Sequence, residues 1–285
     1  MGSVPRALID WHTHVWLPEH LGAEHEAEMA IRTGRSTTAT PERHRAGVAA
    51  AEKFVVVGIK WGHLGANVPN DYIAKYVAQY PGRAIGFACV DPNEPDAPVE
   101  LERSVKVLGL KGLKLSPVYQ GFDSWSPPAW RLYEVADGLG IPIMFHQAAA
   151  FAAQAMLEYG NPVLLDKVAR SFPKLRIIVA HLGQPWIEET VQLLRKHKTV
   201  FADLSARYYR RWQFYNGIQH ALDYQVTGQL LFGSDFPMQS TEEAAAAFRT
   251  CNDFGPGVSL PRIPDSVIDS ILYERPFELL GLSTD

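Results

Sequence analysis

Short apolar runs rich in β-branched residues alternate along the chain with longer stretches of helical periodicity. The runs that we predict to be strands are Ala7–His14, Phe54–Ile59, Ala84–Val90, Gly112–Leu115, Ile141–His146, Arg176–His181, Thr199–Leu204 and Leu230–Asp235. The clearest helical patterns between them are Asp71–Tyr80, Pro128–Leu139, Val163–Phe172 and Trp186–Lys196. Strands that are apolar almost throughout and alternate with helices are typical of a parallel sheet covered by helices.

Two α/β architectures share this pattern, the doubly wound open sheet and the closed barrel. Eight strand–helix units within roughly 250 residues match the count and size of a (β/α)8 barrel. We therefore predict one α/β domain over residues 1–285, a TIM-like barrel, and the weakest of its strands is Gly112–Leu115. The longest connection, residues 15–53, is charged and helix-prone over Glu19–Arg35. We expect this inserted loop to lie over the active-site face of the barrel.

Composition and charge exclude several classes of protein. The 285 residues are 47% hydrophobic and 20% charged, with a formal net charge of −4. These values exclude a disordered chain and give no basic surface for nucleic acid. No apolar run approaches the length of about 18 residues that spans a membrane. Cys89 and Cys251 are too few for a disulfide framework, so we expect two buried or half-buried thiols in a cytoplasmic protein with neither nucleic-acid nor membrane partners.

Side chains that can bind a metal ion end four of the predicted strands. The first run ends with His12 and His14, and the fifth, sixth and eighth end with His146, His181 and Asp235. The C-terminal ends of all strands meet at one rim of a barrel, and residues two apart on a strand point the same way. His12 and His14 can therefore bind one ion, which Asp235 and His146 would complete. Such a nitrogen-rich site suits Zn²⁺, with Mn²⁺, Fe²⁺ or Co²⁺ as alternatives.

Other residues near the strand ends are candidates for substrate binding. Arg207 follows the seventh run, where its guanidinium could clamp a carboxylate, and a purely structural role is equally open. Trp16, just past the two histidines, is the best candidate among the tryptophans for a pocket wall. The remaining histidines are expected to be exposed or in loops, namely His20, His25, His44, His63, His197 and His220. The partner is then a small, anionic molecule.

The ordered motifs IDWHTH, GLKLSPVYQGF, IMFHQ, RIIVAHLGQPW, VFADLS and LFGSDFP resemble the amidohydrolase superfamily. They are most similar to the amidohydrolase-2 branch, which contains aminocarboxymuconate semialdehyde decarboxylase, and the resemblance runs from Leu8 to about Leu282. It implies a TIM-like barrel holding one divalent metal ion, with the ligands His12, His14, His146 and Asp235. It also implies that His181 acts as acid/base, that Asp235 handles protons, and that a homodimer is one expected assembly. In dinuclear relatives the histidine at the place of His181 is a ligand.

Two positions depart from the patterns of the superfamily. Dinuclear members carry a carboxylated lysine near the end of strand four, where this chain has Lys114. We favour a mononuclear site, in which Lys114 is a substrate-binding cation, a barrel-filling residue or a surface residue. Many branch members also read KLHP where this chain reads KLSP, so a role tied to that histidine is absent.

The same ligands serve more than one reaction. The hypothesis that we favour from sequence is a metal-dependent hydrolase, in which metal-activated water attacks a small carboxylated or cyclic ester, lactone or amide. The alternative is a non-oxidative decarboxylase or hydratase of an aromatic or muconate-type acid, in which His181 or Asp235 protonates the carbon that loses CO2. A barrel that binds a metal or ligand without turnover is a third hypothesis. Motifs of serine hydrolases, P-loops and dinucleotide sites do not occur.

Overall fold

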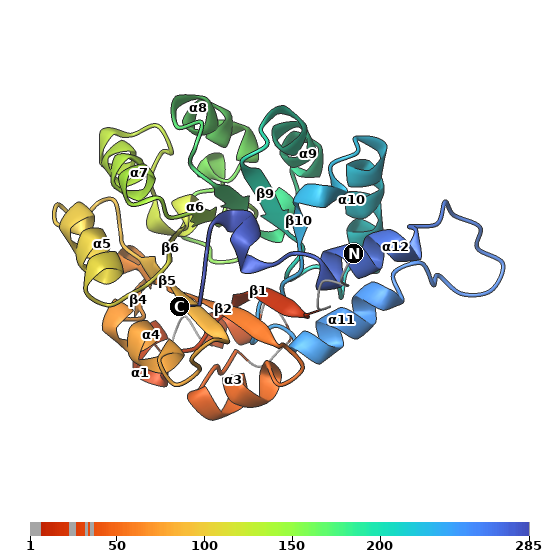
Figure 1. Cartoon of the computed structure of the whole chain (residues 1–285), viewed down its shortest axis with the longest axis horizontal. Helices are drawn as coiled ribbons and strands as arrows, with labels where there is room; N and C mark the ends of the chain where they lie inside the picture. The colour runs from red at the N-terminus through yellow and green to blue at the C-terminus, as the bar shows by residue number, and fades with distance from the viewer. Residues whose placement is uncertain (1–6, 23–26, 32–33, 35–36, 285) are drawn as a thin grey trace.

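The computed structural model describes residues 7–22, 27–31, 34 and 37–284 and contains one eight-stranded parallel sheet. Its strands follow one another in chain order around the molecule (Figure 1). They are β1 (Ile9–Thr13), β2 (Lys53–Val57), β5 (Ala84–Cys89), β6 (Gly112–Leu115), β7 (Ile143–Phe145), β8 (Ile177–Val179), β9 (Val200–Asp203) and β10 (Leu230–Leu231). All eight predicted strands are confirmed, and most are shorter than predicted.

The segment that follows β10 closes the sheet against β1. The backbone N–H of Trp11 donates to the carbonyl of Phe232 at 2.9 Å, and that of Asp235 donates to the carbonyl of His12 at 2.8 Å. Thr13 and Phe236 form an isolated parallel bridge. The sheet is therefore a nearly closed barrel, as predicted, and the doubly wound open sheet is excluded.

Helices cover the outside of the barrel (Figure 1). They are α4 (Asn70–Val77), α5 (Ala97–Lys106), α7 (Pro127–Leu139), α8 (Leu165–Ser171), α9 (Ile187–Lys196), α10 (Arg211–Asp223), α11 (Thr241–Arg249) and α12 (Asp265–Tyr273). Shorter elements lie among the connections, namely α1 (Pro18–Leu21), α3 (Pro41–Gly47), α6 (Pro117–Gln120) and a hairpin of β3 (Lys60–Trp61) and β4 (Ala66–Asn67). Within the described residues no helix is both long and apolar enough to cross a membrane.

The pairing register of β1 explains how one short strand places side chains both in the core and at the rim of the barrel. Between the paired positions Asp10–Phe54 and Thr13–Val56, β1 has one residue more than β2. This irregularity is typical of a β-bulge, which re-aims side chains. Trp11 can thus pack edge-on against Phe277 inside the barrel, with ring centroids 5.1 Å apart, while His12 points to the functional rim.

A glycine begins the strand that is weakest in the sequence. A Cβ on Gly112 would lie 2.6 Å from the ring of Phe87, which fills the space beside β6. Gly112 has no side chain because the ring of Phe87 on the neighbouring strand occupies that space. The glycine makes the strand harder to recognise from the sequence.

Candidate metal centre and substrate cleft

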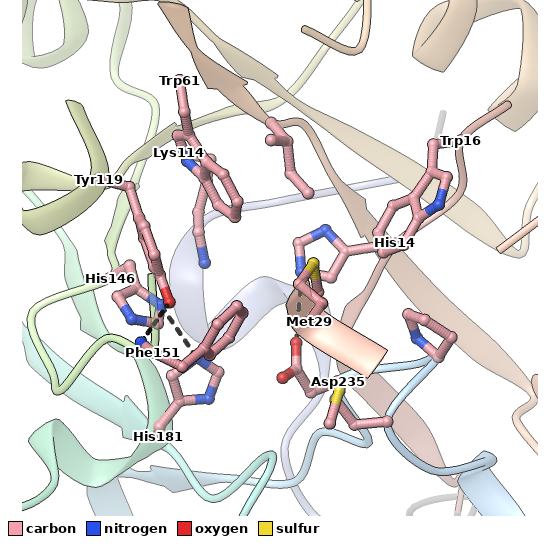
Figure 2. A pocket seen from close by; sticks show the side chains of 13 residues that line it. His14, Trp16, Met29, Trp61, Lys114, Tyr119, His146, Phe151, His181 and Asp235 are labelled. Atoms are coloured by element: carbon pink, nitrogen blue, oxygen red, sulfur yellow. Dashed lines mark hydrogen bonds and ion pairs between the residues drawn. The ribbon is translucent and has the colours of Figure 1, made fainter. Parts of the chain in front are cut away.

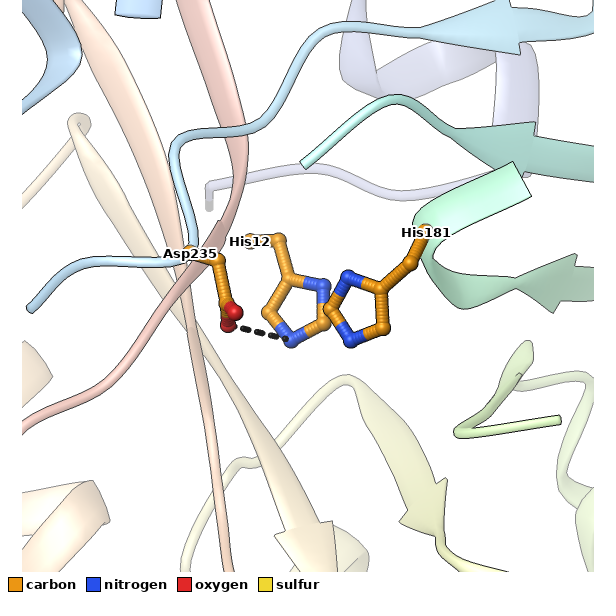
Figure 3. A group of neighbouring side chains, drawn as sticks. All are labelled: His12, His181 and Asp235. Carbon is orange, nitrogen blue, oxygen red and sulfur yellow. Dashed lines mark ion pairs between the residues drawn. The ribbon is translucent and has the colours of Figure 1, made fainter. Parts of the chain in front are cut away.

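Three of the predicted site residues form a tight cluster at the rim of the barrel (Figure 3). His12 lies on β1, His181 follows β8 and Asp235 follows β10. One nitrogen or oxygen atom from each lies within 4.8 Å of the other two. His12 is fully buried and His181 is 4% exposed. The meeting of strand ends at one rim therefore brings together residues that are far apart in the sequence.

The other two predicted ligands adjoin this cluster (Figure 2). Nε2 of His14 lies 3.3 Å from Oδ1 of Asp235, and Nε2 of His12 lies 3.5 Å from the same oxygen. Nδ1 of His146 lies 3.1 Å from Nε2 of His181. Donors that share one ion at about 2.1 Å are about 3.0–3.4 Å apart in octahedral or tetrahedral geometry. The spacings of His12 and His14 to Asp235 lie in or close to that range, so this donor set fits a divalent ion.

Hydrogen bonds fix which ring nitrogen of His12 and His14 is free. Nδ1 of His12 lies 2.9 Å from a carboxylate oxygen of Asp203, and Nδ1 of His14 lies 3.0 Å from the carbonyl of Val57. These oxygens can only accept, so Nδ1 carries the proton in both rings. Each Nε2 then presents a lone pair toward the cluster, as ligating histidines do in proteins.

A similar chain of hydrogen bonds orients His181. The Ser205 hydroxyl donates to Asp203 and accepts from Nδ1 of His181 at 2.8 Å, which leaves a lone pair on Nε2. Nε2 of His146 donates to the carbonyl of Ala149 at 3.1 Å, which leaves a lone pair on its Nδ1. Two lone pairs then face each other across 3.1 Å. The repulsion between them is relieved when a cation binds the lone pair of His146 or when either nitrogen takes up a proton.

Burial favours the neutral form of His14, His146 and His181, the state that binds metals. Burial lowers the pKa of His181 to about 3 and lowers that of His146 well below its ordinary value. It also lowers the pKa of His14. Burial opposes ionisation of Asp235 as well, but the electrostatic field of the nearby imidazoles holds its carboxyl pKa well below the usual range. The site thus combines neutral nitrogens with one carboxylate.

Lys114 extends into the cluster, which excludes the surface role among its three alternatives. The residue is 3% exposed, and its Nζ lies 3.1 Å from Nε2 of His12. Burial lowers the pKa of this amine to about 8, although Asp203 and Asp235 act in the opposite direction. The amine therefore points at the same lone pair that an ion at the cluster would use.

Two connected cavities open from the cluster. The first, the aromatic lobe, has an empty volume of about 470 Å³, and its aromatic walls include Trp16, Trp61, Tyr119 and Phe151. The second, the arginine lobe, has about 550 Å³ and is lined by Arg207, Tyr209 and Arg210. The residues shared by both lobes are Tyr119, His146, Phe151, His181, Asp235 and Met238. The two lobes are therefore parts of one cleft that meet at the cluster.

Arg207 is the unusual polar side chain of this cleft. It is 9% exposed, and its buried Nε has no hydrogen-bond partner among the described residues. Burial lowers the pKa of the guanidinium to about 10, so it is charged at neutral pH. A buried charged donor without a protein acceptor is typical of a site that receives a ligand.

Backbone strain is concentrated at the same rim. Within the described chain, four of the five non-glycine residues with positive φ belong to the turns that follow β8, β9 and β10, namely His181 (58°), Leu182 (51°), Ala206 (56°) and Asp235 (57°). Such conformations cost on the order of 1 kcal/mol or more each and persist where the surrounding structure imposes them. The turns direct His181 and Asp235 inward instead of continuing the strands, which explains why the strands end before their predicted limits.

Two aspartates with structural importance at the site were not identified from sequence. Asp203 ends β9 and hydrogen-bonds His12. Its position at the C-terminal end of a strand is the same sequence signal that identified His181 and Asp235. Asp10 accepts from the backbone N–H of Ser234 at 2.9 Å and from the hydroxyl of Thr241 at 2.6 Å. It thereby fastens the segment that carries Asp235 to β1.

The prediction that His44 is exposed or in a loop is wrong. His44 lies in α3 and is fully buried, with Nε2 2.9 Å from the Thr13 hydroxyl and Nδ1 2.8 Å from the Tyr76 hydroxyl. Its ring lies against Phe54, Tyr76 and Phe236, which come from other segments of the chain, so no local pattern revealed its burial. His25 lies outside the described residues, while His20, His63, His197 and His220 are not buried. Cys89 and Cys251 are buried free thiols, as expected.

Comparison with known proteins gives relatives of two kinds. The chain is 25% identical over 221 residues to a gamma-resorcylate decarboxylase of Polaromonas sp., covering 63% of this chain and 68% of that protein. A dihydroxybenzoic acid decarboxylase of Polaromonas sp., solved with manganese and the inhibitor 2-nitroresorcinol, has a TM-score of 0.65 at 18% identity and covers 96% of this chain and 97% of its own.

The other kind of relative is a hydrolase. A probable 2-pyrone-4,6-dicarboxylic acid hydrolase of Acinetobacter baumannii, solved with citric acid, has a TM-score of 0.69 at 19% identity and covers 97% of this chain and all of its own. The sequence model of the family described as "Amidohydrolase" matches residues 9–282, nearly the whole chain. The chain therefore belongs to the amidohydrolase family, in the branch of TIM-barrel enzymes that resemble aminocarboxymuconate semialdehyde and gamma-resorcylate decarboxylases.

Proposed function

We propose that this enzyme is a metal-dependent carboxy-lyase that removes CO2 from a small aromatic acid without oxidation. The observation that carries the proposal is the aromatic lobe, which opens directly onto the cluster of His12, His181 and Asp235. Flat aromatic walls suit a planar ring. The decarboxylase relatives favour this hypothesis over the hydrolase that we favoured from sequence.

One divalent ion is proposed at the cluster, held by His12, His14, His146 and Asp235. Manganese is the first candidate because a decarboxylase with the same fold was solved with it, and zinc suits the nitrogen-rich donor set. When bound, the ion would withdraw electron density from a substrate oxygen. Lys114 and Trp16 line the same lobe and are proposed to contact the substrate there.

His181 is proposed to carry the proton of the reaction. Its Nε2 is unprotonated because burial lowers the pKa of the ring and Ser205 holds the proton on Nδ1. Nε2 can accept the proton of a ring hydroxyl and deliver it to the ring carbon that bears the carboxylate. The carbon–carboxylate bond then breaks, its electron pair returns to the ring, and CO2 leaves. Water restores the proton of the ring hydroxyl.

A panel of small acids and lactones tests the reaction class. Protein loaded with Mn²⁺ or Zn²⁺ is incubated with hydroxybenzoates labelled with ¹³C at the carboxyl carbon, and labelled CO2 is measured by mass spectrometry. We expect labelled CO2 from at least one ortho-hydroxylated acid. Acid release from lactones with no CO2 from any aromatic acid would show that the lyase proposal is wrong.

Lactone hydrolysis is the second candidate function. It is supported by the similarity to a dicarboxylic acid hydrolase and by the ionised Asp235, which can take a proton from an attacking water. Both candidates use the same residues, so the substrate panel separates them and the residues do not.

A further inference from the structure

We propose that His44 is a positioning residue of the metal centre, which it supports through a hydrogen bond to Thr13. The inference rests on the proposed function, because it concerns the ion that we place at the cluster. His44 lies outside both lobes of the cleft, so it contacts neither the ion nor a substrate. It acts on the proposed ligands His12 and His14 from behind.

The first support is the contact between His44 and β1. Nε2 of His44 lies 2.9 Å from the Thr13 hydroxyl, which lies 2.6 Å from the carbonyl oxygen of Val55 on β2. A carbonyl can only accept, so the hydroxyl donates to Val55 and its oxygen accepts the proton on Nε2 of His44. All three residues are fully buried. The imidazole therefore holds the side chain of Thr13 in one orientation.

Thr13 lies between two proposed ligands at the end of β1. Its neighbours His12 and His14 approach the same oxygen of Asp235, at 3.5 and 3.3 Å, whereas the Thr13 hydroxyl contacts α3. Because β1 has one residue more than β2 between Asp10 and Thr13, the regular ladder does not set the orientation of this segment alone. A side-chain bond that holds Thr13 also fixes the histidines on either side of it.

A chain of hydrogen bonds sets the tautomer of His44. Its Nδ1 lies 2.8 Å from the Tyr76 hydroxyl, which lies 3.2 Å from the Tyr80 hydroxyl. Since Nε2 of His44 carries the proton, Nδ1 accepts from Tyr76, and the Tyr76 oxygen accepts from Tyr80. Nε of the exposed Arg45 donates to Tyr80 at 3.3 Å. Burial lowers the pKa of His44 to about 3, so the neutral ring presents an N–H to Thr13 at neutral pH.

The second support is the segment that carries Asp235. The ring of His44 lies edge-on against that of Phe236, the next residue, with ring centroids 5.4 Å apart. The carbonyl of Phe236 accepts from the backbone N–H of His14 at 2.9 Å. A Cβ on Gly47, one turn further along α3, would overlap the ring of Phe236, so the lack of a side chain there permits this close approach. Helix α3 thus contacts both segments that supply the ligands.

These contacts indicate a static role for His44. The chain of hydrogen bonds ends at the backbone carbonyl of Val55, which has no proton to pass on, so it does not deliver protons to the cleft. Distances between an ion and its ligands must be met to within about 0.2 Å. A small shift of Thr13 and its neighbours therefore suffices to weaken ion binding.

The affinity for Mn²⁺, measured by competition with a fluorescent chelator, tests the proposal. His44→Leu removes the N–H that holds Thr13, and we expect the affinity to fall by about 10-fold, the lower end of the range for residues that support metal ligands. His44→Gln keeps an N–H donor for Thr13 and should recover most of the affinity. The control Tyr133→Phe removes a buried hydroxyl of α7, which donates to the Ser124 carbonyl at 3.1 Å, and should leave the affinity unchanged.

Thr13→Val provides a second variant if His44→Leu folds poorly. It keeps the branched shape at Cβ and removes the hydroxyl that accepts from His44. If His44 acts through Thr13, the two single changes and the double change should lower the affinity by similar factors, whereas independent effects would multiply. Circular dichroism at the assay temperature shows whether each variant is folded. An affinity unchanged in Thr13→Val or in folded His44→Leu, effects that multiply, or an equal loss in Tyr133→Phe would overturn the inference.

CO2 release separates this inference from the proposed function. An affinity for Mn²⁺ that depends on His44 and Thr13, without CO2 from any aromatic acid, would support the positioning role and refute the lyase. CO2 release by the wild-type protein, with an affinity for Mn²⁺ that His44→Leu leaves unchanged, would support the lyase and refute the positioning role. Wild-type protein that binds no ion would refute both.

Discussion

The cluster and the arginine lobe differ in how far the protein satisfies their polar groups. In His12 of the cluster and in His14 beside it, Nδ1 faces an oxygen acceptor of the chain itself, at 2.9 and 3.0 Å. In the arginine lobe, the buried Nε of Arg207 has no such acceptor among the described residues. One end of the cleft is therefore set by internal hydrogen bonds, and the other leaves a buried donor without an acceptor among the described residues.

The two ends of the cleft contribute differently to function. Fixed tautomers and orientations at the cluster prepare lone pairs for an ion before substrate arrives. The unpartnered guanidinium carries a desolvation cost that no hydrogen bond within the described chain offsets. Substitutions at the cluster should therefore act on ion affinity, and substitutions in the arginine lobe should act on stability and substrate affinity.

The largest effect is expected for His12→Ala. His12 lies at the centre of the cluster, with Nε2 3.5 Å from Asp235 and 3.1 Å from Lys114. Loss of a residue that only hydrogen-bonds a ligand lowers ion affinity by up to about 100-fold. We expect the loss of His12, a ligand itself, to lower it further. Metal content measured by plasma mass spectrometry tests this, with exposed His63→Ala as the matched control. Full ion occupancy in His12→Ala would refute the site.

A smaller effect is expected for Asp203→Asn. The amide can keep an acceptor for Nδ1 of His12 only by turning its NH2 group toward the donors of His181 and Ser205, and it removes the negative charge that makes the imidazole a stronger ligand. We expect ion affinity to fall by about 10- to 100-fold. Competition with a fluorescent chelator measures it, and exposed Asp223→Asn is the control. An unchanged affinity would mean that the hydrogen bond does not prepare the ligand.

Lys114→Met should stabilise the ion-free protein in a pH-dependent way. Burial lowers the pKa of Lys114 from 10.5 to about 8, so the unfolded chain takes up this proton more readily than the folded one. The variant should gain up to about 3 kcal/mol in unfolding free energy below pH 8, and the gain should vanish as the pH rises toward 10.5.

Urea denaturation at pH 7 and at pH 10 measures this gain, with exposed Lys198→Met as the control. A loss of stability at pH 7 would show that the contact with His12 outweighs the cost of burying the amine.

The smallest effect is expected for Arg207→Met in the absence of ligand. Removing a buried donor without a partner should raise the unfolding free energy by about 1 kcal/mol, because the wild-type protein carries its desolvation cost. Thermal denaturation should therefore show a slightly higher melting temperature. A lower melting temperature would indicate that the guanidinium is satisfied within the protein, and the contrast between the two ends of the cleft would fail.

The barrel could be predicted from the sequence because its signal is local. Eight apolar runs and the helical stretches between them follow from residue patterns, and strand ends such as His146 and Asp235 fall at one rim in any such barrel. The strand limits were too long because left-handed turns at His181 and Asp235 redirect the chain, which periodicity does not reveal.

Features that depend on packing between distant segments could not be predicted. The ring of His44 is buried among Phe54, Tyr76 and Phe236, and the cavity beside Arg207 is lined by residues of several loops. The choice between lyase and hydrolase was also beyond the sequence, since both reactions need the same ligands. Asp203 is different, because its position at the end of a predicted strand can be seen in the sequence.

The central claim is that an ion at the cluster and a proton carried by His181 together release CO2. The most direct measurement follows labelled CO2 from a hydroxy-aromatic acid while chelator-treated protein is titrated with Mn²⁺, in wild type and in His181→Asn. We predict that wild-type release rises with the ion and saturates near one equivalent. The variant should bind the ion and lose turnover by about 100-fold or more. Full release without the ion, or loss of the ion in His181→Asn, would contradict the account.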